Sequence, residues 1–242
     1  MECRSPCFKR SKPIDMLTII GTEEWKVAHP GAVIGLLEIS GVAGNRASSP
    51  TLDLFKREGE SRLRAMYKDF SRQDFVSIPT MAAYQKYYKK FSKTYHVLLQ
   101  LESIVLKGKS LPNVSPLVDA NFAAEVETLA LTAGHDVSKL IPPIVMDVAR
   151  DGDQFTQMGG TVKNILVGDM VMRDARGLCC SIIHGQDDRS PITPETTHVL
   201  YVVYAPREVP VEAVRAQLQK IEEYIRLFSP EAVTEQNRLL FA

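Results

Sequence analysis

Five side chains that could do chemistry share one short turn of the chain. A histidine and two carboxylates could accept a proton there, an amide could donate a hydrogen bond, and a guanidinium could pair with a phosphate. These residues are His184, Gln186, Asp187, Asp188 and Arg189. One alternative is a solvated turn that only caps two strands. A metal site of His184 with Asp187 or Asp188 is a weak alternative, since it lacks a second ligand cluster, so no metal is expected.

Two short polar side chains, Asp119 and Asn121, follow a proline-rich stretch in LPNVSPLVDANFA, residues 111–123. A serine followed by a proline is typical of a first helical turn, so Ser115 and Pro116 predict a helix start. At about 100° per residue, the two polar side chains lie roughly 200° apart and flank an apolar stripe. An alternative role for Asp119 is to accept backbone N–H bonds at the helix start. The stripe consists of Val118, Phe122, Val126 and Leu129, and the small residues on the side of Asn121 are Ala120 and Ala124.

A basic and aromatic segment, YQKYYKKFSKTYH at residues 84–96, has the composition of an RNA contact. Its lysines could neutralise phosphates, and its tyrosines could stack on bases. On a helix these lysines share one face. The alternative is a solvated helix side with the tyrosines packed behind it. The lysines are Lys86, Lys89, Lys90 and Lys93, and the tyrosines are Tyr84, Tyr87, Tyr88 and Tyr95.

The elements that must position these groups change character along the chain. The first half favours helices, because apolar residues recur there with helical spacing. After about residue 134, β-rich runs separated by Gly, Asp and Pro indicate a sheet or small barrel. We therefore predict an α+β fold, with a mixed β-sheet or barrel-like core flanked by helices. Strands are expected at 17–21, 30–42, 165–174, 177–185 and 197–206, and helices at 22–29, 49–70 with an interruption at Gly59, 79–91, 95–105, from 116, and at about 210–228, the last closing the chain.

The composition bounds the class of protein. With 242 residues, 45% of them hydrophobic and 24% charged, the chain can bury a sizeable core. No apolar run approaches the ~18 residues of a membrane span, so no membrane partner is expected. The 29 basic and 29 acidic residues cancel, which argues against a general nucleic-acid coat. Residues 1–110 nevertheless carry 18 basic and 11 acidic side chains, against 11 and 18 in residues 111–242; this leaves a basic face unless the two halves neutralise each other.

The N-terminus and the cysteines indicate a cytoplasmic protein. Residues 1–15 lack the apolar stretch of a secretory signal, and we interpret them as a flexible tail before one domain over 16–242. Cys179 and Cys180 are adjacent inside an apolar run, whereas Cys3 and Cys7 lie in the tail. This spacing gives neither a CxxC pair nor a secreted disulfide framework, so we expect reduced core thiols.

Four segments, in this order, carry a resemblance to a known family. They are KGKSLPNVSPLVDANFA, AGHDVSKL, VARDGDQFTQMGG and SIIHGQDDRSPITPETTHVLYVV. Together they resemble the stand-alone relatives of the B3/B4 module of the phenylalanyl-tRNA synthetase β subunit, from about Pro30 to about Pro206. The resemblance implies a cleft between sheet and helices that binds the aminoacylated 3′ end of tRNA. In the synthetase this module hydrolyses the ester of a wrongly attached amino acid, tyrosine in particular.

Several positions depart from that family's pattern. Ala133 stands where the family has its site histidine, and His135 follows two residues later, where the family has an aromatic residue. Asn121 falls on a threonine position and Phe122 on an asparagine position. Arg189 takes the place of the glutamate that recognises the substrate hydroxyl. The tyrosine-specific site is therefore not preserved, so the chain either hydrolyses a different ester or binds without hydrolysis.

The resulting hypothesis is a tRNA-editing-like protein that acts in trans and needs no cofactor. An ester at the tRNA terminus is already activated, so a positioned water, a donor near the carbonyl oxygen and the neighbouring ribose hydroxyl could suffice. Phosphate-loop motifs are absent, so no ligase activity is expected. The competing hypothesis is a non-catalytic module for RNA or an amino-acid-like ligand. One cavity is expected to gather His184, Asp187 and His135 as catalytic groups and Asp119, Asn121, Asp136, Gln186 and Arg189 as substrate contacts.

Overall fold

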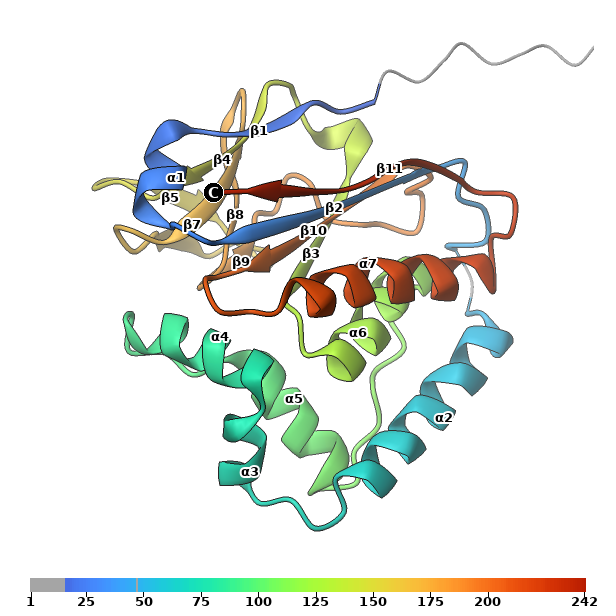
Figure 1. Cartoon of the computed structure of the whole chain (residues 1–242). Helices are drawn as coiled ribbons and strands as arrows, with labels where there is room; N and C mark the ends of the chain where they lie inside the picture. The colour runs from blue at the N-terminus through green and yellow to red at the C-terminus, as the bar shows by residue number, and fades with distance from the viewer. Residues whose placement is uncertain (1–15, 47) are drawn as a thin grey trace, which may run out of the picture.

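Sheets and helices occupy separate regions of the fold (Figure 1). The computed structural model describes residues 16–46 and 48–242. The expected tail, residues 1–15 with Cys3 and Cys7, lies outside the described residues. In the described chain, most buried apolar side chains from sheets and helices form one cluster. The predicted α+β class with a mixed sheet flanked by helices is confirmed, and the sheets described here are open, so none closes into a barrel.

A four-stranded antiparallel sheet in the order β11-β2-β10-β3 lies at the centre. β2 and β10 are buried along their whole lengths, as their continuous apolar sequences predict. β3 forms one edge of this sheet. Within the sheet only β10 pairs with it, and on its other side an isolated bridge joins His135 to Pro191. The strands are β2 (Val33–Ser40), β3 (Thr132–Asp136), β10 (Val199–Ala205) and β11 (Val233–Phe241).

A second, mixed sheet has the order β1-β4-β7-β8-β9. β1 runs parallel to β4, and the other pairs are antiparallel. The strands predicted at 165–174 and 177–185 are shorter than expected. The first begins only at Met170, because a turn at Gly168, with φ of +84°, precedes it. The second is divided into β8 and β9 by a turn before Gly185, which has φ of +79°. The strands are β1 (Ile19–Gly21), β4 (Ile144–Val148), β7 (Met170–Asp174), β8 (Gly177–Ser181) and β9 (Gly185–Gln186), with a separate ribbon of β5 (Gln154–Thr156) and β6 (Val162–Asn164).

Helices α6 and α7 lie along the four-stranded sheet, and α2 to α5 lie beyond them (Figure 1). α7 approaches β2 so closely that a Cβ at Gly35 would lie 2.7 Å from Val214 Cγ1. No helix in the described ranges combines the length and apolar character needed to cross a bilayer. The helices are α1 (Glu23–Ala28), α2 (Pro50–Met66), α3 (Arg72–Ser77), α4 (Pro79–Lys89), α5 (His96–Val105), α6 (Pro116–Thr128) and α7 (Val211–Arg226), with the 3₁₀ turn η1 (Val137–Lys139).

Two expectations about helix ends are wrong. α2 continues through Gly59, where it packs so tightly that a Cβ would lie 2.6 Å from Glu127 Oε1. The glycine therefore serves close packing and does not break the helix. The predicted helix at about 210–228 is present as α7, but it does not close the chain, because β11 follows and pairs with β2. β11 was not predicted, because it is a half-exposed edge strand whose polar sequence lacks a continuous apolar run.

Candidate functional site

A cavity of about 270 Å³ lies between α6, the edge strand β3 and the turn that links β8 to β9. Its walls come from segments far apart in the sequence. Among the described residues, no Lys, Arg, Asp or Glu lines it. The cavity is therefore suited to a neutral, mostly apolar group that makes a few hydrogen bonds. The lining includes His96, Asn121, Phe122, Ala133, Gly134 and Gln186.

The pairing of β3 with β10 determines which of its backbone groups face the cavity. Leu131 and Val137 bond to β10 through their backbones. Because bonding alternates along an antiparallel pair, the intervening residues Thr132, Gly134 and Asp136 direct their N–H groups outward. The Thr132 N–H donates to a carboxylate on α6, and the Asp136 N–H donates to the backbone of the loop after β9. The outward N–H between them belongs to Gly134, beside the cavity.

Only glycine fits at position 134. A Cβ there would lie 2.6 Å from Ile192 Cδ1 and 3.0 Å from Tyr201 Cε1. Contacts under about 3 Å between carbon atoms are strongly repulsive, so any side chain would displace its neighbours. The absence of a side chain therefore lets Ile192 and Tyr201 pack against the backbone of β3 beside the cavity.

His96, the first residue of α5, lines the cavity, and sequence reasoning missed it. It is the only one of the five histidines that does so. Its Nδ1 lies 3.3 Å from the Tyr88 hydroxyl. Desolvation by the surrounding side chains lowers its pKa below 6.5, although part of the residue is exposed, so the ring is neutral at pH 7 and can accept a proton. The one available signal was its place at the end of the basic and aromatic segment, directly ahead of the α5 stripe.

Of the predicted site residues, Asn121 and Gln186 meet at the cavity. Asn121 bridges α6 to two neighbours: its Nδ2 donates to Thr132 O and its Oδ1 accepts from Gln217 Nε2, both at 3.3 Å. The Gln186 Nε2 group donates to Ser190 O at 2.8 Å. Its carbonyl oxygen is thus the group that Gln186 can offer to a ligand.

The apolar stripe predicted on α6 is partly wrong. Val126 is buried, but Val118 and Phe122 are only half-buried and line the cavity. The helix is instead buried on most of its other faces, because it lies between the four-stranded sheet, α7 and α5. Phe122 therefore contributes a cavity wall and leaves the hollow open.

His135 does not line the cavity, although the alternation of side chains along β3 puts it on the same face as Ala133, which does. The ring is fully buried. Its Nδ1 lies 2.8 Å from Ser190 Oγ and 3.0 Å from Gln186 Nε2. Burial lowers its pKa to about 3, so it stays neutral. His135 thus supports Gln186 from behind the cavity wall.

Asp187 and Arg189 were expected in the cavity, but they pair with each other outside it. Arg189 Nε lies 2.7 Å from Asp187 Oδ2, and Arg189 Nη1 lies 3.2 Å from Asp174 Oδ1. Arg189 also donates to Leu178 O. Asp187 accepts a hydrogen bond from Ser190 Oγ at 2.8 Å. These contacts hold the turn after β9 against β7 and β8, which leaves no charged group of the turn for a ligand in the cavity.

His184 and Asp136 also lie outside the cavity lining. His184 is half-buried, and burial together with the nearby Lys93 and Lys163 lowers its pKa. The buried Asp136 carboxylate accepts hydrogen bonds from Ser138 N at 3.0 Å and Thr196 Oγ1 at 2.8 Å. It therefore starts η1 and anchors the loop before β10. The expectation that one cavity gathers all the predicted groups is wrong for these residues.

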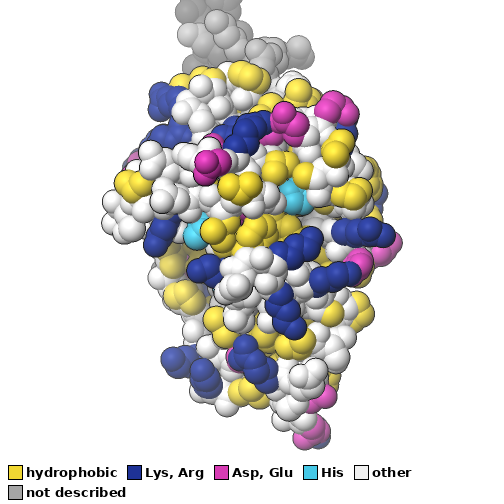
Figure 2. All heavy atoms as spheres, turned by 90° about the vertical axis from the view of Figure 1, so that its left-hand side faces the viewer, with side chains coloured by type: hydrophobic (Ala, Val, Ile, Leu, Met, Phe, Trp, Pro, Cys, Tyr) yellow, Lys and Arg dark blue, Asp and Glu magenta, His cyan; other side chains and the backbone are white. Residues whose placement is uncertain are grey.

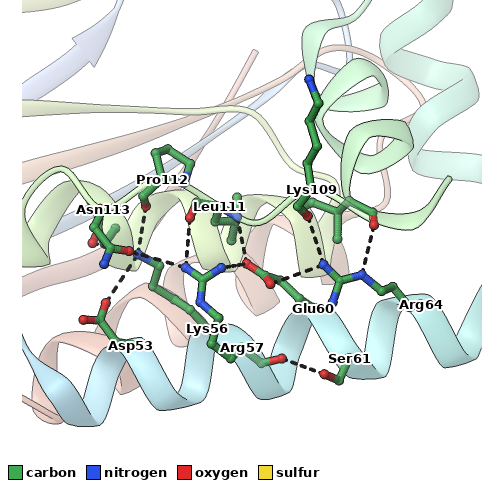
Figure 3. A network of polar contacts seen from close by, with 12 residues as sticks. Asp53, Lys56, Arg57, Glu60, Ser61, Arg64, Lys109, Leu111, Pro112 and Asn113 are labelled. Carbon is green, nitrogen blue, oxygen red and sulfur yellow. Dashed lines mark hydrogen bonds and ion pairs between the residues drawn. The ribbon is translucent and has the colours of Figure 1, made fainter. Parts of the chain in front are cut away.

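Asp119 lies on the far side of α6, in a buried ion pair. Its Oδ2 accepts from Lys56 Nζ at 2.8 Å, and its Oδ1 accepts from the Val114 N–H at 2.9 Å. The ammonium group also donates to Pro112 O and Asn113 Oδ1 (Figure 3). The alternative role considered for Asp119, a backbone acceptor at the helix start, is therefore the one observed.

The basic and aromatic segment is split between surface and core. Lys86 and Lys89 lie on α4, Lys90 ends that helix, and Lys93 lies in the loop before α5, so the four lysines do not share one helix face. Basic side chains gather around apolar ones on this side of the molecule (Figure 2). The stacking role considered for the tyrosines is wrong, because all four are buried. They are Tyr84, Tyr87, Tyr88 and Tyr95.

Cys179 and Cys180 are free and buried, as predicted. Burial raises the pKa of the Cys180 thiol to about 12, so this cysteine remains a protonated thiol. In the ranges 16–46 and 48–242, no group of three or more potential metal-binding side chains occurs.

Glu125 gives the fold a distinctive pH dependence. It is buried on α6 and accepts from the Thr132 N–H at 2.9 Å. Burial raises its pKa from 4.5 to about 8. The folded chain therefore keeps a proton that the unfolded chain has lost at pH 7. The stability linked to this proton is fully present below pH 4.5 and is lost as the pH rises toward 8.

Replacing Glu125 with Gln should therefore stabilise the protein at pH 7.5, by roughly 2–4 kcal/mol, because the neutral amide needs no proton uptake. Urea unfolding at pH 4.5 and pH 7.5 would measure the effect, which should almost vanish at the lower pH. Glu195→Gln at an exposed loop position is the matched control. An equal effect of Glu125→Gln at both pH values would contradict the assignment.

The comparison with family models agrees with the sequence resemblance. The family model described as the B3/4 domain matches residues 80–229, an interval that contains every residue lining the cavity. A solved N-terminal fragment of the phenylalanyl-tRNA synthetase β-subunit from Pyrococcus horikoshii is similar, with a TM-score of 0.46 and 11% identity over 94% of this chain. The chain covers 56% of that fragment's length. No curated protein matches the chain.

Proposed function

The chain belongs to the B3/4 domain family, and from this membership we propose that its cavity binds the aminoacyl group at the 3′ end of a tRNA and hydrolyses the ester in trans. The observation that carries this proposal is the meeting of His96, Gln186 and the Gly134 backbone at one uncharged cavity. The reaction would take place in the cytoplasm on tRNA charged elsewhere.

The size and lining of the cavity support an amino-acid side chain as the buried group. Drug-sized ligands occupy roughly 300–1,000 Å³, so about 270 Å³ suits one amino-acid moiety with the nucleotide left outside. Ala133 lines the cavity where the family resemblance places a histidine, and Arg189 lies outside it. With no carboxylate to accept a bond from a substrate hydroxyl, we expect an apolar aminoacyl side chain rather than tyrosine.

The groups at the cavity can be assigned to steps of ester hydrolysis. The neutral His96 ring accepts a proton from water as the water oxygen bonds to the ester carbonyl carbon. The Gly134 N–H stabilises the negative charge that develops on the carbonyl oxygen. The carbonyl oxygen of Gln186 accepts from the substrate amino group. The bond from the carbonyl carbon to the ribose oxygen then breaks, and that oxygen takes the proton from His96.

The lysines on this side of the molecule provide the tRNA contact in this proposal. Lys89, Lys90 and Lys93 have exposed side chains, and a phosphate backbone close to the α4 end would bind them with a strong dependence on salt. The buried tyrosines contribute no stacking surface. The RNA contact is therefore proposed as electrostatic, with base-independent affinity.

A second candidate function is binding without hydrolysis. The observation in its favour is that His184, Asp187 and His135, the catalytic groups expected from sequence, all lie outside the cavity lining. An uncharged cavity could then hold an amino-acid-like ligand without turnover. The difference between the two functions is whether the ester is cleaved.

Deacylation assays over a panel of mischarged tRNAs test both functions. Esters of apolar amino acids should be released, and Ala133→Leu should slow release at least about tenfold, because the larger side chain fills the cavity. Ala82→Leu, at an exposed position on α4, is the matched control. Tight binding of charged tRNA without release would establish the second function. The absence of both binding and release would overturn both.

A further inference from the structure

A second hollow, of about 300 Å³, lies between α4, the turn after α1 and the loop that follows β10. It differs from the first cavity because charged side chains dominate its rim. Its wall includes Ala28, His29 and Pro30, which precede the interval 80–229 matched by the family. It shares no lining residue with the aminoacyl cavity, so the inference drawn from it does not depend on ester hydrolysis in that cavity.

Three cationic side chains from two separate segments converge on this hollow. Lys86 and Lys90 come from α4 and its end, and Arg207 comes from the loop after β10. Lys90 Nζ lies 5.7 Å from the centroid of the Tyr87 ring, which also lines the hollow. The attraction between an ammonium group and a ring face helps to hold this lysine at the rim.

The aliphatic stem of Arg207 packs beside Gly31. Gly31 has φ of +81°, and a Cβ there would touch Arg207 Cγ at 3.5 Å and Cδ at 3.9 Å. The arginine stem therefore lies over the backbone of the turn before β2 and carries its guanidinium to the rim. Such packing of an aliphatic stem on the surface leaves the charged end free for a ligand.

The net charge of the hollow is positive. Its one carboxylate, Glu208, lies 2.6 Å from Lys86 Nζ in a largely exposed pair. Burial and the nearby Lys90 lower the pKa of His29 to about 4, so this ring is neutral. Three cations against one anion leave an excess of two positive charges.

We propose that this hollow binds a phosphate group, with Arg207 and Lys90 as its direct partners. A dianionic phosphate matches the excess charge, and a guanidinium can hold two of its oxygens at once. Lys86 would join by exchanging its exposed contact with Glu208 for the phosphate. The same chemistry could come from a free phosphate monoester or from an RNA backbone, and the experiment distinguishes these two sources.

The proposal is tested in the wild type by titration with inorganic phosphate. The NMR chemical shift of the Arg207 Nε–H group monitors this titration. A saturable shift is expected. Binding in the variants is followed by calorimetry. Arg207→Gln or Lys90→Gln should weaken binding about tenfold or more, because each removes a charge-assisted hydrogen bond. Glu208→Gln should tighten it several-fold by removing the competing anion. Lys107→Gln, at an exposed position after α5, removes the same charge elsewhere and should change nothing.

Competition by a short RNA that lacks a terminal phosphate identifies the source. Displacement of inorganic phosphate by this RNA would assign the hollow to the RNA backbone, and retention would assign it to a free phosphate monoester. The proposal is overturned if phosphate gives no saturable shift, or if Lys107→Gln weakens binding as much as Arg207→Gln does. In either case the cations act only as general surface charge.

Discussion

Replacing His96 with Gln is expected to slow the release of an amino acid from charged tRNA by about 10²- to 10⁴-fold. This is the usual contribution of a positioned general base, and His96 is the one histidine that lines the cavity. Gln keeps much of the side-chain volume but cannot take up the proton. Binding of the charged tRNA should change little, so the loss should appear in kcat. Single-turnover deacylation at saturating protein would measure it.

The pH profile supplies an independent test of His96. Desolvation lowers its pKa below 6.5, and a base acts in its unprotonated form. The rate should therefore be constant between pH 7 and 8 and should fall as the pH drops through the His96 pKa. His184→Gln is the contrasting variant and should keep the wild-type rate within about twofold. Equal losses of rate in the two variants would show that His96 is not the base. So would a rate that already falls, as the pH is lowered, while the pH is still above 6.5.

Replacing Lys56 with Met is expected to destabilise the fold by about 3–5 kcal/mol. The Lys56 side chain is fully buried, and its ammonium pairs with Asp119 and donates to Asn113 Oδ1 and Pro112 O (Figure 3). Methionine leaves the Asp119 carboxylate buried without its cation, and an uncompensated buried charge of this kind costs about that much. Urea unfolding at pH 7 would measure the loss, with the exposed Lys68→Met as control.

A double variant separates the ion pair from simple packing. Lys56→Met together with Asp119→Asn removes both charges and should recover a large part of the lost stability. The neighbouring Glu60, whose Oε1 accepts from the Leu111 N–H at 2.7 Å (Figure 3), should keep α2 attached to the segment ahead of α6 in all variants. A loss below about 1 kcal/mol for Lys56→Met, or no recovery in the double variant, would contradict this role.

Helix starts show how far local sequence can predict the structure. Thr22, the first residue of the helix predicted at 22–29, caps α1 through its own side chain, which accepts from Trp25 N. Ser115 and Pro116 also begin α6 as predicted, but the Ser115 side chain makes no cap bond. The side chain that accepts from the first turn is Asn45, whose Oδ1 lies 2.9 Å from Leu117 N. The start of α6 could therefore be predicted from its own residues. Its capping side chain could not, because Asn45 lies about seventy residues earlier in the chain.

The strand β3 shows the same limit at the site. The family resemblance drew attention to the segment of Ala133 and His135, and both lie on β3. Only the fold shows that Ala133 and Gly134 line the cavity while His135 supports Gln186 from behind. Burial on each side of an edge strand depends on what packs against it, and that is absent from the strand's own residues.

By itself, the sequence determined the α+β class, the family, the buried strands β2 and β10, and the presence of α7, because continuous or periodic apolar patterns are local properties. Tertiary structure alone decided the site. It brought His96 to Asn121 and Gln186, moved Asp119 into a pair with Lys56, and buried the tyrosines of α4. The physical reason is that a polar side chain becomes a ligand contact or an internal partner according to which distant groups surround it.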